Sequence, residues 1–340
     1  MDSVRSMIPG LVVVSILAGL ATWAGQLPFL QALRISPVIV GILIGVVLGN
    51  GAGERLPAAW GQGITFSAKK ILRLAIILYG FRITFAEIAS VGWAGFFLDV
   101  CMVALTLIIG VFVGTRWLGM DKETSIMTSA GAAICGAAAV VATEPIVKAE
   151  AHKTAISVAT VVIFGTIAMF LYPLVYRTGM VPMSEDVFGI YVGASIHNVG
   201  HAVAAGEAVS SAATNTAVIV KMTRVMLLAP ALLAIGWFVN RRSASGDDAE
   251  AGLVIPWFAL GFIAVAGFNS LGLLGKPLVD TIIELDTFLL TMAMTALGLN
   301  TVVGKFKGVG WEPLKLALVL SVWLIVGGYT LTQLFVGSGL

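Results

Sequence analysis

Long apolar runs recur from one end of the chain to the other, and they limit what it can fold into. Hydrophobic residues make up 59% of the 340 residues and charged residues 11%, against about half and about a quarter in a soluble domain. A water-soluble fold of this length cannot hide so much apolar surface. A run of about 20 apolar residues crosses a bilayer as a helix. The sequence therefore predicts an all-α integral membrane protein of ten or eleven transmembrane helices.

The apolar runs give eleven candidate spans, at about 8–27, 35–50, 64–86, 91–117, 124–143, 153–176, 187–208, 213–239, 253–275, 282–303 and 312–336. The first run lacks a small-residue cleavage site, so we expect a retained helix. Connections are short, and only 241–252, RRSASGDDAEAG, has the composition of a flexible loop. We expect one polytopic membrane domain over 1–340, without a soluble domain.

Lysine and arginine accumulate on the cytoplasmic side of membrane proteins, and their distribution predicts the orientation. With the N-terminus inside, eleven of them lie at cytoplasmic ends and five at opposite ends. The eleven are Arg5, Arg55, Lys69, Lys70, Arg116, Lys122, Arg177, Arg241, Arg242, Lys305 and Lys307, and the five are Arg34, Arg82, Lys148, Lys153 and Lys276. We expect a cytoplasmic N-terminus and an external C-terminus.

Two sequence blocks recur about 218 residues later in the chain. Leu74 to Trp93 aligns with Met292 to Trp311, and after one residue of slip Pro37 to Asn50 aligns with Pro256 to Asn269. The paired blocks are an odd number of spans apart, so they would run in opposite directions. Inverted repeats of this kind build many secondary transporters.

The repeat predicts two related halves, at about 30–176 and 186–336. A shorter echo relates Gly131 to Ala142 with Gly193 to Ala204. These two stretches are rich in Gly, Ala and Ser. We expect them either to pack very closely or to break and expose helix ends inside the membrane.

Lys221 and Arg224 are the principal candidates for a substrate site. They are three residues apart and share a helix face, inside a span that contains no acid. A charge inside a membrane span costs about 2.5–3.5 kcal/mol on insertion scales, which makes such a residue a functional candidate. We expect the pair to face an anion. The alternatives are that they extend to an interface or pair with an acid.

His197, Asn198 and His201 form a second candidate group. The histidines are four apart, so a helix would place them on one face. They would contact the substrate, with His197 also a candidate for proton coupling, or they would be packed and hydrogen-bonded. Two histidines supply too few ligands for zinc, and no metal site is expected.

Arg73 and Tyr79 are further candidates for substrate contact, although Arg73 follows two lysines and would also suit an interface. Asp99 is an acid within an apolar run. It is a candidate for ion or proton coupling, a partner for a buried cation, or an interface residue. Glu284 and Asp286 lie near the start of a later span.

Gly41, Gly45 and Gly49 recur at every fourth residue and predict close helix packing, within the bundle or at a homodimer interface. Cys101 and Cys135 lie in apolar runs and are expected to be thiols.

No GxSxG, Walker, CxxC or HExxH motif occurs, so we expect neither an enzyme nor a cofactor. No basic patch suggests nucleic acid. If the chain is a transporter, the remaining ways to drive it are coupling to an ion or proton gradient and simple exchange.

Four motifs together resemble the YeiH-type family of bacterial inner-membrane proteins labelled as sulfate exporters: ILRLAIILYGFRIT (71–84), SAGAAICGAAAV (129–140), SIHNVGHAVAAG (195–206) and VKMTRVMLLAP (220–230). The likeness covers nearly the whole chain. It implies the crossed, broken helices of sodium/proton antiporters and bile-acid transporters, an elevator-like motion, and a small anionic substrate such as sulfate or a sulfonate. A cation/proton antiporter and a non-transporting sensor or assembly protein are the alternatives.

Overall fold

The computed structural model describes residues 6–27, 29–30, 36–51, 57–240, 257–302 and 310–337, and within these ranges it contains helices and no strand. Six of the helical segments are long and apolar enough to cross a membrane: Ile8–Gly25, Phe85–Trp117, His152–Arg177, Ser211–Val239, Lys276–Asn300 and Trp311–Gly337. The chain is an all-α integral membrane protein, as its composition predicts. The expected loop at 241–252 lies outside the described residues, as do Arg5, Arg34, Arg55, Arg241, Arg242, Lys305 and Lys307 of the orientation count.

The helices form two compact units that alternate along the chain. Unit 1 comprises the described parts of Met1–Ser90, Glu207–Val209 and Trp257–Lys307. Unit 2 comprises those of Val91–Gly206, Ser210–Pro256 and Gly308–Leu340.

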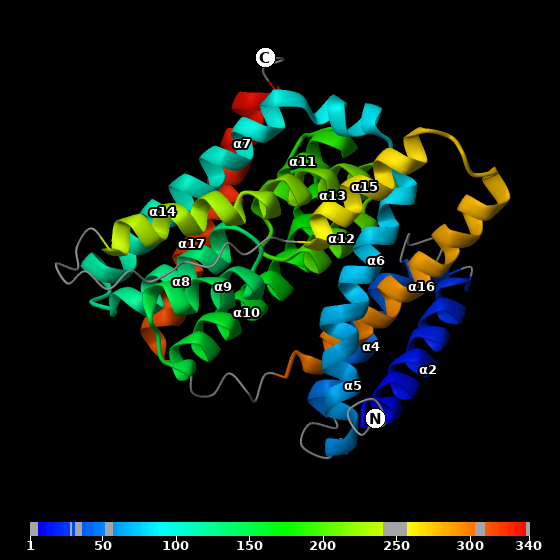
Figure 1. The fold of residues 1–340 in the computed structure, drawn as a ribbon, viewed down its shortest axis with the longest axis horizontal. Coiled ribbons are helices and arrows are strands. Elements are labelled where there is room, and N and C mark those ends of the chain that lie inside the picture. The colour runs from blue at the N-terminus through cyan, green and yellow to red at the C-terminus, as the bar shows by residue number, and fades with distance from the viewer. Residues whose placement is uncertain are drawn as a thin grey trace. The chain divides into compact units, whose positions relative to one another are not determined.

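Unit 1 is a bundle whose main helices are α2 (Ile8–Gly25), α4 (Pro37–Gly51), α5 (Gly61–Phe66), α6 (Leu72–Tyr79), α15 (Trp257–Ser270) and α16 (Lys276–Asn300). A π turn, η3 (Ser67–Ile71), joins α5 to α6, and a 3₁₀ turn, η4 (Gly80–Arg82), continues α6. Helix α4 packs against α16 and α2, and α15 packs against α6 (Figure 1).

The ridge of Gly41, Gly45 and Gly49 is the surface of α4 that contacts α16. A Cβ atom at Gly45 would lie 2.2 Å from the carbonyl oxygen of Thr295, and one at Gly49 would lie 2.7 Å from that of Leu299. Only glycine lets the two backbones approach so closely. The prediction of close packing within the bundle is confirmed.

Paired contacts in unit 1 repeat with the spacing seen in the sequence. Gly80 packs on the backbone of α15 at Phe262, and Gly298, 218 residues later, packs on the backbone of α4 at Ile42. Such reciprocal contacts are typical of a two-fold relation between α4 and α6 on one side and α15 and α16 on the other. The first helix of each pair packs on the second helix of the other pair.

Two asparagines make the same hydrogen bond in both copies. Asn50 donates its side-chain amide to the carbonyl of Thr301 at 2.8 Å, and Asn269 donates to the carbonyl of Ile83 at 3.2 Å. Thr301 and Ile83 are themselves 218 residues apart and follow the ends of α16 and η4. The asparagines thus satisfy carbonyls that a helix end leaves open.

Gly92 and Gly310 occupy equivalent positions of the repeat, near the points where the chain passes from unit 1 into unit 2. Gly92 has φ 60° and lies within α7 (Phe85–Phe112), and Gly310 has φ 28° and precedes α17 (Trp311–Thr332). Positive φ favours glycine. The following residues, Trp93 and Trp311, are each 75% exposed.

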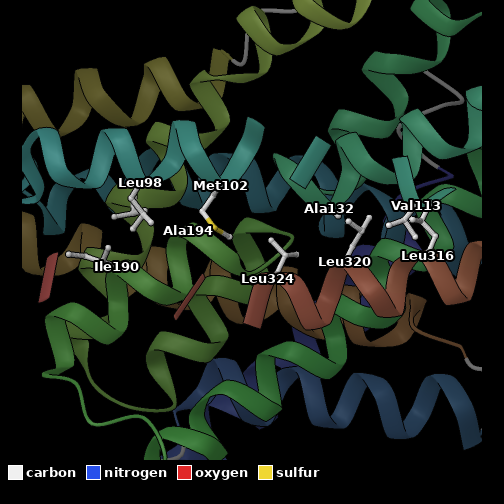
Figure 2. Packing of buried hydrophobic residues seen from close by; sticks show 10 residues of the cluster. Leu98, Met102, Val113, Ala132, Ile190, Ala194, Leu316, Leu320 and Leu324 are labelled. Carbon is white, nitrogen blue, oxygen red and sulfur yellow. The ribbon is translucent and has the colours of Figure 1, made fainter. Parts of the chain in front are cut away.

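Unit 2 contains the larger part of α7 and α17, together with α8 (Lys122–Ala133), α9 (Ala137–Val147), α10 (Ala151–Arg177), α11 (Glu185–Ser195), α12 (Val199–Glu207, up to Gly206), α13 (Ser211–Met226) and α14 (Leu228–Asn240). Its apolar core joins α7, the π turn η5 (Val113–Trp117) that continues α7, α11 and α17: Leu98 and Met102 face Ile190 and Ala194, and Val113 lies beside Leu316 (Figure 2).

The expected spans 124–143 and 187–208 are both interrupted. The first becomes α8 and α9, and the second becomes α11 and α12. The interruptions, at Ile134–Gly136 and Ile196–Asn198, are 62 residues apart, which is the spacing of the shorter echo. Of the two alternatives that the sequence left open for these Gly- and Ala-rich stretches, close packing or a break, the structure has a break in both.

Asp121 caps the start of α8 by accepting a hydrogen bond from the backbone N–H of Thr124 at 2.9 Å. Lys153 donates to Asp121 at 3.0 Å and to Glu123 at 3.2 Å. Partial burial raises the pKa of Asp121, but its hydrogen bonds with Glu123, Thr124 and Lys153 outweigh this and hold that pKa well below its usual range.

Candidate functional site

The break between α8 and α9 leaves two backbone carbonyls without a helical partner. Helix α8 ends where the N–H of Ile134 bonds the carbonyl of Ala130 and the N–H of Gly136 bonds that of Gly131. Gly136 then turns the chain with φ 78°. The carbonyls of Ala132 and Ala133 remain, and buried carbonyls need donors.

The break between α11 and α12 lies beside it. A Cβ atom at Gly136 would lie 3.5 Å from the Cβ of Asn198 and 3.5 Å from the carbonyl oxygen of His197. Four helix ends therefore meet in one place: the C-terminal ends of α8 and α11 and the N-terminal ends of α9 and α12.

Small residues bring α13 against α11 and so to this junction. A Cβ at Gly189 would meet the carbonyl of Ala213 at 2.5 Å, and one at Gly193 would meet that of Ala217 at 2.6 Å. Such close backbone approach is typical of small residues four apart in membrane helices. This close packing places the next turn of α13, which contains Lys221, beside the C-terminal end of α11.

Arg224 binds the C-terminal ends of both broken helices. Its Nε donates to the carbonyl of Ala133 at 2.5 Å and its Nη2 to that of Ala132 at 2.9 Å. Its Nη1 donates to the carbonyls of Ala194 at 2.6 Å and Ile196 at 3.4 Å. The side chain is fully buried. A guanidinium has five donors in a fixed planar fork and so holds several acceptors in one geometry, whereas an ammonium has three donors and no such plane.

Lys221 is also fully buried, and its Nζ donates to the carbonyl of Ile196. Both cations therefore reach the same carbonyl, which confirms that they share a helix face. A helix C-terminus carries about half a negative charge, so the ends of α8 and α11 together offset about one of the two positive charges.

Asp99 of α7 is the acid that interacts electrostatically with Lys221 and Arg224. It is fully buried, and neither carboxylate oxygen has a hydrogen-bond donor within the described part of the chain. The hydrogen bonds that Arg224 and Lys221 make go to backbone carbonyls instead. An ionised carboxylate in such a dry environment is costly.

His197 and His201 are buried in the same unit, and their charges interact with that of Lys221. The expectation that they share a helix face is wrong, because α11 ends at Ser195 and His197 lies in the non-helical segment before α12. His201 packs on Gly165 of α10, where a Cβ atom would meet its Nδ1 at 2.4 Å. Neither ring nitrogen of His201 has a hydrogen-bond partner among the described residues.

The junction, defined by Asp99, His197, His201, Lys221 and Arg224 with the two helix breaks, gathers groups that attract negative charge. The first turns of α9 and α12 present N–H groups that have no intrahelical acceptor, and the N-terminus of a helix attracts negative charge. The unpartnered nitrogens of His201 add polar groups, neutral or charged, at the start of α12.

Two other sequence candidates lie in unit 1. Arg73 is exposed, with its guanidinium 5.7 Å from the ring centroid of Phe258. Tyr79 is buried, and the guanidinium of Arg82 stacks 5.0 Å from its ring centroid. Their part in substrate binding stays a prediction.

Sequence reasoning missed a partly buried ion pair in unit 1, in which Arg82 Nε lies 3.0 Å from Asp286 Oδ2. The two residues are 204 positions apart, and no local pattern joins them. Among the described residues, no group of three or more His, Cys, Asp or Glu side chains could hold a metal ion. Cys101 and Cys135 take part in no disulfide within the described part of the chain.

The family model described as "Conserved hypothetical protein 698" matches residues 9–317. A UPF0324 inner membrane protein, YeiH, of Escherichia coli strain K12 is 48% identical over 94% of this chain and 92% of its own. A UPF0324 membrane protein of Bacteroides thetaiotaomicron is 46% identical over 96% and 98%, and one of Bordetella pertussis is 44% identical over 97% and 95%. No solved structure matches.

Proposed function

The chain belongs to the family of conserved hypothetical protein 698, which includes membrane proteins of the YeiH type, and from this premise we propose that it is a secondary transporter of a small anion such as sulfate or a sulfonate. The substrate lies at the junction of the broken helices in unit 2. The chain acts without a cofactor or an enzymatic step, in the inner membrane, with its N-terminus in the cytoplasm and its C-terminus outside. Export as the direction comes from the resemblance to the YeiH-type family alone.

The observation that carries the proposal is the pair of buried cations at two helix breaks. Discontinuous helices whose ends meet within the membrane form the substrate sites of many secondary transporters. A sensor or assembly protein has little reason to keep Lys221 and Arg224 fully buried at such a point, because each charge is costly in the membrane.

The charges at the junction suggest how anion binding is coupled to a proton. The N-terminal ends of α9 and α12 add about one positive charge at the junction, which the C-terminal ends of α8 and α11 cancel. When Asp99 is ionised, about one of the two positive charges of Lys221 and Arg224 remains. When Asp99 is protonated, about two remain, and a dianion such as sulfate balances them. Anion and proton are therefore bound together. The two gradients then set the direction in which both move.

In this scheme Arg224 donates to four carbonyls and fixes the positions of the two helix breaks. Lys221 donates to one carbonyl and keeps its other donors for the anion. The backbone N–H groups of α9 and α12, with His197, Asn198 and His201, complete the anion's contacts. Asp99 carries the proton.

Proton uptake during sulfate binding tests the proposal on purified protein in weakly buffered solution. We expect the wild type to take up about one proton for each sulfate bound. Asp99→Asn should bind sulfate without proton uptake, because its side chain is already neutral. Lys221→Met should lose sulfate binding, whereas Lys122→Met, at an exposed position of the same unit, should bind normally. The proposal is wrong if neither sulfate nor a small sulfonate binds to the folded wild type.

A cation/proton antiporter is the second candidate, and the unpartnered oxygens of Asp99 favour it. It would bind the cation at Asp99 and would release protons on sodium addition. Proton release on addition of sodium, together with no response to sulfate, would select this alternative.

A further inference from the structure

Each of the two broken segments of unit 2 turns back on itself. Helix α8 begins at Lys122 and α9 ends at Val147, and collinear helices would place these two ends about 37 Å apart at 1.5 Å per residue. Lys153 follows the end of α9 by six residues, which reach at most about 22 Å. Its Nζ nevertheless donates to Asp121, the N-cap of α8, at 3.0 Å. Helices α8 and α9 therefore form a hairpin whose two open ends lie together.

Helices α11 and α12 turn back in the same way. Gly189 of α11 and Gly206 of α12 are 17 residues apart, which is about 25 Å in collinear helices. A Cβ atom at Gly189 would lie 2.5 Å from the carbonyl oxygen of Ala213, and one at Gly206 would lie 2.6 Å from the Cα of Thr214. These two atoms of α13 belong to one peptide unit. The first half of α11 and the end of α12 therefore both lie against the start of α13.

Helix α10 holds the open ends of the two hairpins at its opposite ends. It begins at Ala151, four residues after the end of α9, and its segment His152–Arg177 is long and apolar enough to cross a membrane. Near its other end, the ring centroids of Tyr176 and Phe188 lie 4.4 Å apart. Phe188 is in the first turn of α11. If α10 crosses the membrane, the two hairpins open toward opposite faces.

The closed ends of both hairpins lie at the middle of α10. A Cβ atom at Gly136, in the break of the first hairpin, would lie 3.1 Å from Cγ1 of Val161. His201, in the first turn of α12, packs on Gly165. Val161 and Gly165 are the eleventh and fifteenth of the 27 residues of α10. Because the two breaks also meet each other at Gly136 and Asn198, the junction lies about halfway between the ends of α10.

The distribution of basic residues favours hairpins that do not cross the membrane. If α8–α9 does not cross, Lys148 and Lys153 lie on the same face as Lys122. Arg177, at the far end of α10, then lies on the other face. The distribution of lysine and arginine becomes twelve cytoplasmic against four external, in place of eleven against five, and so agrees better with the excess expected on the cytoplasmic side.

The shorter echo is explained in the same way. Its two copies are α8–α9 and α11–α12, and α10 lies between them in the chain. If each copy returned to its own face and α10 crossed once, the copies would enter in opposite directions, as an inverted repeat requires. If both copies crossed the membrane, they would run in the same direction.

We propose that α8–α9 and α11–α12 are re-entrant hairpins, which enter the membrane from opposite faces and meet in its middle, and that an anion reaches the junction from each face past the hairpin of that face. Irregular backbone at membrane depth is tolerated where protein surrounds it, and both breaks are almost entirely buried. The topology does not depend on what is transported. The route of access rests on the proposed function.

Sided labelling of single cysteines tests the topology in a chain whose two native cysteines are replaced by serine. Lys122→Cys and Lys148→Cys flank the first hairpin, and Met180→Cys and Ala212→Cys flank the second, all at exposed positions. The probe is 2-sulfonatoethyl methanethiosulfonate, an anion that does not cross the bilayer, applied to spheroplasts and to inside-out vesicles. We expect the first two cysteines to react only from the cytoplasmic face and the last two only from the outer face.

In a chain whose hairpin segments cross the membrane, the two cysteines that flank each segment would react from opposite faces. That result for either segment overturns the proposal, and so does reaction of all four cysteines from one face. Arg116→Cys, at an exposed position before α8, is the matched control and should react from the same face as Lys122→Cys in either topology. Labelling needs no sulfate, so this result and that of the sulfate-binding test are independent.

Asn198→Cys, at the closed end of the second hairpin, tests the route of access with the same probe. We expect it to react from both faces, and more slowly than the flanking cysteines, because each route is open for only part of the time. Reaction from one face alone, or from neither, overturns the route of access. Failure of the wild type to bind sulfate overturns the proposed function instead and leaves the labelling of the flanking cysteines unchanged.

Discussion

Replacing Arg224 tests whether the two broken helices depend on one guanidinium. Arg224→Lys keeps the charge but replaces a planar group that reaches four carbonyls by a single ammonium. At least two of these charge-assisted bonds are lost, at about 1.5–3 kcal/mol each, so we expect about 3–6 kcal/mol of destabilisation. Arg224→Met leaves the carbonyls of Ala132, Ala133 and Ala194 without donors, which costs about 3–9 kcal/mol in total.

These losses are a large part of a typical folding stability of about 5–15 kcal/mol. For a unit of about 200 residues, 1 kcal/mol corresponds to roughly 2–4 °C in Tm. Thermal unfolding in detergent should therefore show Arg224→Lys at least about 6 °C below the wild type, and Arg224→Met should be lower still or fail to fold. Arg116→Lys, at an exposed position, is the matched control and should change little. A Tm for Arg224→Lys within about 1 °C of the wild type would refute the reasoning.

Three further outcomes follow from the packing and the caps. Asn50→Ala and Asn269→Ala should each lower stability by about 0.5–1.5 kcal/mol, because each loses its bond to a helix-end carbonyl. The loss for Asn50→Ala should be at least as large, because Asn50 also donates to the carbonyl of Val46; wild-type stability of either variant in denaturant unfolding would contradict the role of these bonds. Gly298→Ala should be strongly destabilising, since its Cβ would meet a backbone oxygen at 2.4 Å, whereas Gly19→Ala, in open space on α2, should stabilise by about 0.5–1 kcal/mol. Asp121→Ala should lose about 1 kcal/mol of capping energy; because the pKa of Asp121 is lowered in the folded state, its contribution is complete above about pH 4, and Tm measurements at pH 5.5 and pH 8 should show the same loss.

The helices and the repeat could be predicted because their causes are local. Apolar length gives the spans, and the positions that must be small or must cap, such as Gly80, Gly298, Asn50 and Asn269, recur with the repeat spacing. The small residues of Gly131 to Ala142 and Gly193 to Ala204 indicated either close packing or a break, but composition alone does not decide between the two.

The partners of the charged residues could not be predicted in the same way. Arg224 binds backbone carbonyls, and the sequence does not mark which carbonyls a break leaves open. Arg82 and Asp286 meet only through the packing of η4 on α16. His197 departs from the expected helical face because the break begins one residue before it, and helical spacing applies only within a continuous helix.

Anion flux in proteoliposomes tests the central claim most directly. With radiolabelled sulfate inside the vesicles and an internal pH indicator, the account predicts that sulfate and protons leave together through the wild type. Lys221→Met should abolish both movements, and Asp99→Asn should permit sulfate exchange without proton movement. The account is contradicted if flux of sulfate and of a small sulfonate through the folded wild type does not exceed the leak of protein-free vesicles.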